Sequence, residues 1–157
     1  MIDTIPTTYY HTQRGLWYLL VYAISFLPLI AAFVVRDNLA IAMPFLLAAI
    51  ALSVVAACFQ HLTVTDEGDR LRIKFGPLPL FQRSVRYEDI EQVEVSRTSI
   101  MDGWGIHLSH RGGWVWNIWG RDCVLIERQR GWKLWLGTDE ADELCQFLKW
   151  KIVSNAK

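Results

Sequence analysis

Two long uncharged apolar segments near the N-terminus constrain this chain more than any other feature. They cover residues 16–35 and 39–59, with only residues 36–38 between them. At ~1.5 Å rise per residue, an α-helix over either segment is about 30 Å long, which is the thickness of the hydrocarbon core of a bilayer. We therefore expect a transmembrane helical hairpin over residues 16–59.

Two alternatives compete with membrane spans. Buried core helices would need a covering layer, but only about 98 of the 157 residues follow Phe59, too few to enclose two helices that are apolar on every face. A cleavable signal peptide normally has an apolar run of roughly 7–15 residues, which is shorter than segment 16–35. Because Ala40-Ile41-Ala42 is a possible cleavage site, this second alternative stays open.

The second apolar segment is rich in small residues, which favour close packing of helices in membranes. They are Ala48, Ala49, Ala51, Ser53, Ala56 and Ala57. The sequence leaves open whether they pack on the first helix or on a helix of another protein.

Basic residues near the spans indicate the orientation of the hairpin. Two spans place both termini on the same side of a membrane. Arg14 precedes the first span, and Arg70, Arg72 and Lys74 follow the second within the range where basic residues favour the cytoplasmic side. We expect a multi-pass protein with both termini in the cytoplasm, where its three cysteines would be free thiols.

The charge balance excludes one class of partner. The chain has 16 Lys and Arg against 16 Asp and Glu, so its formal net charge is zero. A nucleic-acid-binding domain normally carries an excess of basic residues that contact phosphates. We expect no nucleic-acid partner.

The part that follows the hairpin, residues 60–157, shows short strand patterns at regular intervals. Leu71, Ile73 and Phe75 alternate with charged residues, which is typical of a strand with one buried face. About seven such strands precede a final segment whose apolar residues recur at helical spacing. The prediction is an all-β barrel or sandwich capped by a C-terminal α-helix, with residues 1–15 as an N-terminal tail.

Several short motifs follow one another along the chain. They are Leu62-Thr63-Val64, Phe75-Gly76-Pro77, Asp89-Ile90, Gly103-Trp104-Gly105-Ile106, Arg111-Gly112-Gly113-Trp114, Asn117-Ile118-Trp119-Gly120 and Leu136-Gly137-Thr138-Asp139. Their order is similar to that in bacterial pleckstrin-homology-like domains, in particular small membrane proteins with an N-terminal transmembrane hairpin. The resemblance covers roughly residues 16–153. It implies a PH-like fold, a location in the bacterial inner membrane and a binding or scaffolding role, and it implies no shared reaction.

Residues 103–120 combine four tryptophans with five glycines. The glycines predict turns with positive φ, and the residues between them predict a strand with aromatic side chains. Some of the rings must fill the interior of so small a barrel. Because tryptophan is enriched at bilayer interfaces, we expect the others to face the membrane or a partner. The candidates for this surface are Trp104, Trp114, Trp116 and Trp119.

Basic residues suggest a second candidate surface. Arg70, Arg72, Lys74 and Arg86 could share the outer face of the first β-hairpin of the domain and contact anionic lipid there. In eukaryotic pleckstrin-homology domains, basic residues around this hairpin bind phosphoinositide headgroups. Here the turn at residues 66–69 carries three carboxylates, which repel a phosphorylated headgroup. We therefore expect loose attraction to anionic lipid at most, with a merely solvated face as the alternative.

The sequence lacks signatures of catalysis and of cofactor or metal binding. It contains no HExxH, GxSxG, Gly-rich phosphate loop or CxxC motif. His107 and His110 are so spaced that on a strand they would point to opposite faces rather than to one metal ion. We predict no enzyme activity, no cofactor and no metal. A membrane enzyme that acts on lipid through Glu88, Asp89 or His107 stays open as an alternative.

Together these patterns predict a non-enzymatic integral membrane protein whose cytoplasmic PH-like domain binds or scaffolds a protein or a lipid. The expected partners are membrane lipids and another membrane or membrane-associated protein, and a homo-oligomer is also open. The main rival is an accessory or assembly subunit of a larger membrane complex that works through its transmembrane hairpin. The alanine-rich second helix motivates that rival.

Overall fold

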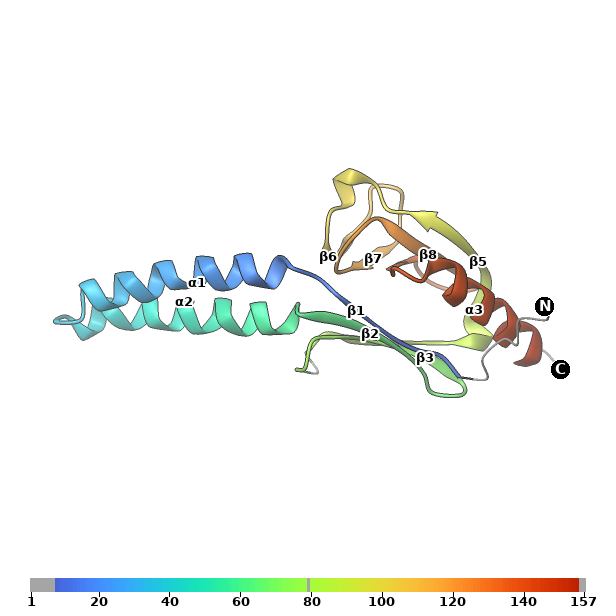
Figure 1. The fold of residues 1–157 in the computed structure, drawn as a ribbon, viewed down its shortest axis with the longest axis horizontal. Coiled ribbons are helices and arrows are strands. Elements are labelled where there is room, and N and C mark those ends of the chain that lie inside the picture. The colour runs from blue at the N-terminus through green and yellow to red at the C-terminus, as the bar shows by residue number, and fades with distance from the viewer. Residues whose placement is uncertain (1–7, 79, 156–157) are drawn as a thin grey trace.

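The computed structural model describes residues 8–78 and 80–155. Two antiparallel helices, α1 (Trp17–Val34) and α2 (Leu39–Cys58), project from one end of a β-domain (Figure 1). Both are long and apolar enough to cross a bilayer, and only 11% of α1 and 17% of α2 are buried within the protein. The domain therefore does not enclose them, which argues against core helices. Residues 1–7 of the predicted tail, and residues 79, 156 and 157 of the predicted domain, lie outside the described residues.

The two helices pack on each other through small side chains. Ala42, Ala49 and Ala56 are the buried alanines of α2 and recur at heptad spacing along one face. The Ser53 hydroxyl of α2 lies 3.3 Å from the Ser25 hydroxyl of α1 and donates a hydrogen bond to it. This stripe shows that some of the small residues of the second helix pack on the first helix.

Four antiparallel strands form the first sheet, in the order β1-β2-β3-β4. They are β1 (Tyr10–Arg14), β2 (His61–Asp66), β3 (Arg70–Phe75) and β4 (Gln82–Arg86). Strand β1 corrects the prediction that residues 1–15 form a tail, because it pairs with β2 along its whole length. Its sequence shows no apolar alternation, since the inward positions His11 and Gln13 are polar.

Five strands form the second sheet, in the order β5-β8-β9-β7-β6. They are β5 (Ile90–Arg97), β6 (Gly105–Leu108), β7 (Trp114–Asn117), β8 (Asp122–Arg128) and β9 (Leu134–Gly137). Strands β7 and β9 pair in parallel, and the other neighbours in this sheet pair antiparallel. Two short 3₁₀ helices, η1 (Tyr87–Asp89) and η2 (Ile100–Asp102), stand before and after β5.

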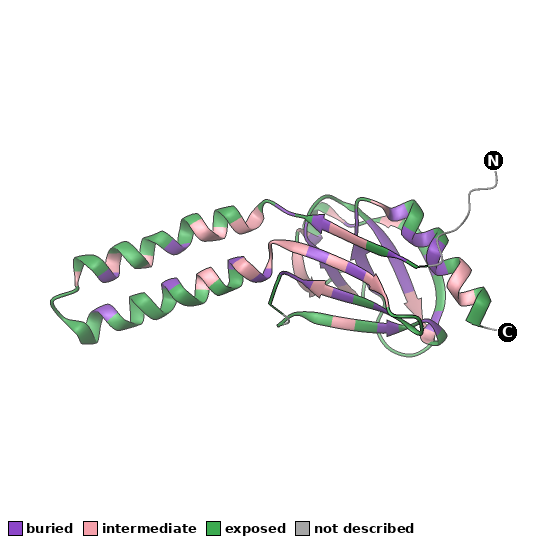
Figure 2. Cartoon of the chain, turned by 60° about the horizontal axis from the view of Figure 1, so that its bottom comes forward, coloured by how far each residue is buried: buried purple, intermediate pink, exposed green. Residues whose placement is uncertain are grey.

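The two sheets and a C-terminal helix, α3 (Ala141–Asn155), enclose one apolar core (Figure 2). Inward side chains of the strands alternate with exposed ones, and α3 packs against β5, η1 and β8. The helix contributes Ala141, Leu144, Cys145, Phe147 and Leu148 to this core. The structure thus confirms a two-sheet β-domain with a C-terminal amphipathic helix.

Both membrane-type helices continue into paired strands of the first sheet without a linker. Arg14, the last residue of β1, lies opposite His61, the first residue of β2. Gly76, which follows β3, packs against the backbone carbonyls of Ala57 and Cys58, where any Cβ would collide. The end of the hairpin is therefore held by β1, β2 and the end of β3.

A buried ion pair ties α3 to the first sheet. Lys151 Nζ lies 2.9 Å from Asp66 Oδ2, and the two side chains are 11% and 2% exposed. The Tyr87 hydroxyl donates a hydrogen bond of 2.8 Å to Asp66 Oδ1. Burial alone would raise the pKa of Asp66, but hydrogen bonds from Lys151, from the Gly68 N–H and from Tyr87 outweigh it and lower this pKa. The fold thus holds Asp66 in its charged form.

Replacing Lys151 with Met should destabilise the domain by about 3 kcal/mol, because the buried charge of Asp66 loses its partner. The matched control is Lys149→Met on the exposed face of α3, where we expect a change within about 0.5 kcal/mol. Chemical unfolding of the full chain in detergent micelles measures both variants. Equal stability of the two would contradict the role of the ion pair.

Candidate functional site

Three tryptophans gather where the hairpin meets the domain. Trp17 begins α1, Trp104 precedes β6, and Trp119 lies in the turn after β7. The rings of Trp104 and Trp119 stack with their centroids 5.3 Å apart and their planes 7° from parallel, and the Trp17 ring lies 4.9 Å from that of Trp104. Trp104 and Trp119 are 42% and 39% exposed. This tryptophan cluster therefore links α1 to the domain and still faces the surroundings.

The turn that carries Trp119 is held by the buried side chain of Asn117. Its Nδ2 donates a hydrogen bond of 3.0 Å to the Gly120 carbonyl, and its Oδ1 accepts one of 3.1 Å from the Trp119 N–H. Trp104 Nε1 donates to the same carbonyl at 3.2 Å, and Gln13 Nε2 of β1 donates to the Trp119 carbonyl at 3.1 Å. Gly120 has φ 75°, which a residue with a side chain rarely adopts. Glycine allows the tight turn, and the turn holds the rings of Trp104 and Trp119 in place, which is why glycine and tryptophan occur together here.

An apolar cavity of about 360 Å³ opens beside the tryptophan cluster. Its walls come from both parts of the molecule. They are Trp17, Val21 and Phe59 at the ends of the hairpin, and Trp104, Gly105 and Ile118 of the domain. The junction between hairpin and domain is thus apolar and loosely filled, which suits a membrane interface better than water.

Of the four candidate tryptophans, Trp114 and Trp116 belong to the interior and not to this surface. Both occupy inward positions of β7, since the alternation along the strand turns Val115 to the opposite face. Trp116 is 7% exposed, and its ring lies 5.6 Å from that of Phe75 across the core. Trp114 is half-buried against the same core. The predicted surface is therefore reduced to Trp104 and Trp119.

The predicted basic residues share the outer face of the first sheet, where Arg70 lies opposite Arg86. Acidic neighbours pair with three of them: Asp69 with Arg70 (2.7 Å), Glu67 with Arg72 (2.8 Å) and Glu88 with Arg86 (2.7 Å). Exposed pairs of this kind contribute little to stability, but they neutralise the charge that an anionic headgroup would meet. Lys74 is the member without an ion pair in the described part of the chain.

Lys74 belongs to a small positive patch at the hairpin end of the first sheet. Arg14 and His61 face each other in the strand register, and Lys74 follows on the neighbouring strand. Burial lowers the pKa of His61, and the charges of Lys74 and Arg14 lower it further. Arg14 and Lys74 therefore supply the positive charge of this patch.

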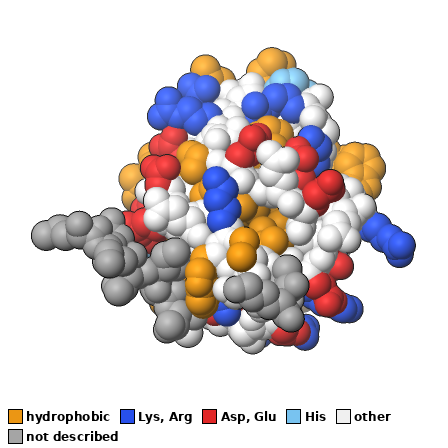
Figure 3. Space-filling view, turned by 90° about the vertical axis from the view of Figure 1, so that its right-hand side faces the viewer, with side chains coloured by type: hydrophobic (Ala, Val, Ile, Leu, Met, Phe, Trp, Pro, Cys, Tyr) orange, Lys and Arg blue, Asp and Glu red, His pale blue; other side chains and the backbone are white. Residues whose placement is uncertain are grey.

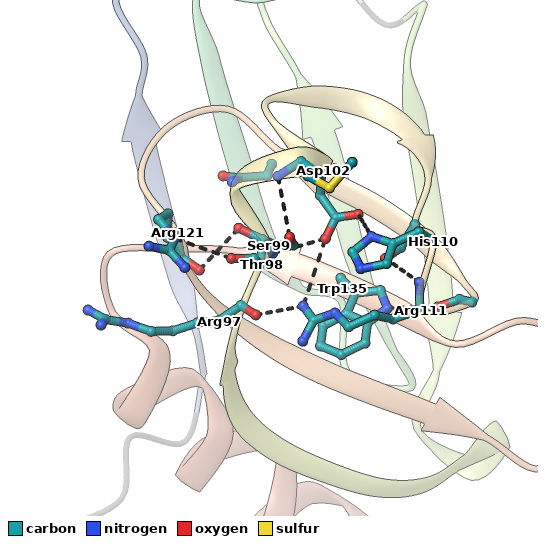
Figure 4. Close-up of polar contacts among 12 residues, drawn as sticks. Arg97, Thr98, Ser99, Asp102, His110, Arg111, Arg121 and Trp135 are labelled. Atoms are coloured by element: carbon teal, nitrogen blue, oxygen red, sulfur yellow. Dashed lines mark hydrogen bonds and ion pairs between the residues drawn. The ribbon is translucent and has the colours of Figure 1, made fainter.

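A polar cluster that the sequence analysis missed is centred on Asp102, in the loop between β5 and β6 (Figure 4). Its side chain is 2% exposed. The Ser99 N–H donates a hydrogen bond of 2.9 Å to Asp102 Oδ2, and His110 Nδ1 lies 3.3 Å from Oδ1. Arg111 donates to the Arg97 carbonyl at 2.6 Å and lies 3.8 Å from Asp102. The capping-box spacing of Ser99 and Asp102 is the sequence signal that could have found it.

The Asp102 cluster closes a second, smaller core on the outer face of the second sheet. This core consists of Val115, Cys123, Leu125 and Trp135. The Arg111 guanidinium lies 4.1 Å above the Trp135 ring. Burial alone would raise the pKa of Asp102, but hydrogen bonds from Ser109, Ser99 and His110 outweigh it and lower this pKa. The cluster thus fixes the loop that crosses the sheet.

Exposed apolar side chains border the domain on the side of the hairpin. Figure 1 places the loop after β3 (green) and η2 (yellow) on this side, on opposite flanks of the helices. We call this set the apolar rim; its members are Leu78, Leu80, Phe81, Ile100, Met101, Trp104 and Trp119. Leu78 also lines a groove between α1 and α2, so the loop after β3 reaches alongside the helices.

The candidate catalytic residues do not come together. Glu88 and Asp89 lie in η1 and pair with neighbouring arginines. His107 lies on β6, at the opposite edge of the second sheet from β5, which follows η1. In the part of the chain that the structure describes, no three potential metal ligands are grouped. Burial raises the pKa of Cys123 to about 12 and also raises that of Cys145, which disfavours reactive thiolates.

No protein-family model matches the chain, and no curated protein matches it. The similarity to bacterial pleckstrin-homology-like domains therefore stays a prediction.

Replacing Asp102 with Asn should destabilise the domain by about 1–3 kcal/mol, because buried donors lose a charged acceptor. Since the pKa of Asp102 is lowered on folding, its contribution is complete above the ordinary carboxyl pKa and is lost as the pH falls through the lowered value. The unchanged protein and the variant should therefore converge in acid. Unfolding midpoints across pH measure this, with the exposed Asp122→Asn as the control. A stability difference independent of pH would contradict the assignment.

Proposed function

We propose that this chain is a non-enzymatic integral membrane protein that holds a PH-like binding and scaffolding domain at the cytoplasmic face of the bacterial inner membrane. The hairpin anchors the domain, which binds lipid through its membrane side and a protein partner through the rest of its surface. One observation carries this proposal: the tryptophan cluster and the apolar rim lie on the same side of the domain as the hairpin.

The location of the exposed apolar residues supports membrane contact. If the helices span a bilayer, the ends of the helices at Trp17 and Cys58 lie at its surface. Trp104 contacts Trp17 directly, so its ring lies at the same level. The rim then rests in the headgroup region, where tryptophan is favoured because its ring is apolar and its N–H is polar. The patch of Arg14 and Lys74 adds attraction of about 1 kcal/mol per basic residue for anionic lipid.

The far side of the domain supports a protein partner. Figure 3 shows this end with Lys, Arg, Asp and Glu side chains intermixed and with apolar side chains between them. Such a surface has no single sign of charge and suits a polar protein interface better than a membrane or a nucleic acid. A second copy of the chain is one partner of this kind.

The fold supports the PH-like assignment in part. Two largely antiparallel sheets with a C-terminal helix packed on them agree with the resemblance. The chain departs from it in the strand β1, which precedes the hairpin, and in the parallel pair β7 and β9. The candidate catalytic residues lie in separate parts of the domain, Glu88 and Asp89 in η1 and His107 on β6, which agrees with a binding role.

The rival function, an assembly subunit that works through its hairpin, has one observation in its favour. Two apolar grooves of about 470 and 400 Å³ lie along the hairpin, one near its tip and one near the domain. A foreign helix would fit there as well as lipid does. Photo-crosslinkers at the exposed Ile50 of α2 and the exposed Val153 of α3 discriminate the two functions. Protein adducts from α2 alone would favour the rival, and adducts from α3 favour the scaffolding domain.

The depth of the apolar rim tests the proposed membrane contact. Met101 is 87% exposed, and the native cysteines are buried, so M101C accepts a thiol-linked fluorophore selectively. In nanodiscs we expect blue-shifted emission from this label and strong quenching by lipids with spin labels near the headgroup. A label on V153C, at the far end of α3, is the control and should emit as in water. If the label at position 101 emitted as it does in water and were not quenched by the lipids, the proposal would be contradicted.

A further inference from the structure

An open groove separates the edge strands of the two sheets on one side of the domain. Strand β4 ends the first sheet and β6 ends the second, so each pairs on one side only. The groove between them has a volume of about 420 Å³, within the range of small-molecule sites. Arg83 of β4 lines it together with Leu80 and Phe81 of the loop before β4, and Ile106, Trp114 and Trp116 line it from the second sheet.

Arg83 gives this apolar groove an unbalanced positive charge. It shares the inward side of β4 with the buried Val85 and is itself half-buried. Within residues 8–78 and 80–155 its guanidinium has neither an ion pair nor a hydrogen bond, unlike Arg70, Arg72 and Arg86 on the outer face. Isolated charges in apolar surroundings are costly unless an anion pairs with them.

A second arginine adds to the charge around Arg83. Burial lowers the pKa of Arg83, and the nearby charge of Arg128 lowers it further. Arg128 reaches one carboxylate, that of Asp89, at 3.6 Å, and its Nε is buried without a hydrogen-bond partner among the described residues. The two guanidinium groups thus lie near each other, and among the described residues the carboxylate of Asp89 pairs with Arg128 alone. A bound anion would reduce the repulsion between the two arginines.

The groove lies close to the domain end of the hairpin. Leu80 and Phe81 follow Leu78, which lines the groove between α1 and α2. The Phe81 ring lies 5.6 Å from that of Phe59 at the end of α2. Apolar side chains therefore lie both beside the membrane helices, at Leu78, and beside Arg83, at Leu80 and Phe81.

We propose that this groove binds an anionic phospholipid, whose phosphate contacts Arg83 and whose acyl chains run along Phe81 and Leu80 toward the hairpin. The proposal rests on the membrane location put forward above. It explains why an unpaired cation lies among tryptophans, and why the apolar loop beside it remains exposed. The site is distinct from the outer face of β3 and β4, where the arginines already have acidic partners.

Native mass spectrometry of the full chain, released from nanodiscs that contain phosphatidylcholine and phosphatidylglycerol, tests the proposal. We expect selective retention of phosphatidylglycerol. Arg83→Gln should reduce this retention about tenfold, because the lipid phosphate loses a charged hydrogen-bond donor. The matched control is Arg86→Gln on the same strand, whose side chain faces solvent and which should retain the lipid unchanged.

A second variant keeps the test independent of the folding of Arg83→Gln. Leu80 is 62% exposed and lines the groove, so Leu80→Glu adds a carboxylate to the groove without changing the core. It should reduce retention of phosphatidylglycerol to a similar degree. Thermal unfolding of each variant identifies any loss of fold.

Several outcomes would overturn the proposal. These are equal retention by Arg83→Gln and Arg86→Gln, equal retention of the two lipids, or glycerol phosphate binding as tightly as the intact lipid. Arg83-dependent binding of an acidic peptide that phosphatidylglycerol does not compete with would assign the groove to a peptide instead. The depth label at position 101 is independent of these readouts, so a rim in the membrane without lipid selectivity would contradict this inference alone.

Discussion

The pairing of β1 with β2 is the constraint on which the rest of the structure depends. These strands flank the two helices in sequence, and Arg14 lies opposite His61 at the point where the helices leave the sheet. The two helices therefore continue directly from the paired strands β1 and β2, and no flexible linker joins them to the domain. Because Gly76 also packs on the backbone of α2, the domain has little freedom to turn relative to the helices.

This fixed geometry determines which surfaces of the domain lie beside the two helices. It brings Trp104 to Trp17, and it keeps the apolar rim on the side of the hairpin. It also places the groove around Arg83 next to the loop that runs alongside α2. Two buried carboxylates stabilise the domain itself: Lys151 pairs with Asp66, and Asp102 holds the loop between β5 and β6. The apolar rim, which is left exposed, lies close to the two helices.

Features that depend on periodicity in one segment could be predicted from the sequence. The apolar runs predicted the hairpin, the alternation around Ile73 predicted β3, and the spacing of Leu144 and Leu148 predicted the buried face of α3. Strand β1 could not be predicted, because its inward side chains are polar and its partner lies beyond the hairpin. Its stability comes from pairing with β2 rather than from its own apolar residues.

The candidate site was predictable only in part, since it depends on contacts between distant segments. The composition of residues 103–120 predicted surface tryptophans, but only the fold separates Trp104 and Trp119 from the inward Trp114 and Trp116. The predicted basic residues were found on one face, as expected, yet their acidic neighbours neutralise three of them. The role of Arg83 could not be predicted from the sequence, because its lack of an acidic partner among the described residues depends on how the edges of the two sheets meet.

A spin-label scan along α1 and α2 in nanodiscs tests the central claim most directly, namely that both helices cross a bilayer and carry the domain against its surface. Single labels report collision with oxygen, which concentrates in the hydrocarbon core, and with a water-soluble nickel chelate. The account predicts high oxygen and low nickel accessibility at the middle of both helices, with the two values crossing near Trp17 and Cys58. Nickel accessibility that stays high along the whole of both helices would contradict it.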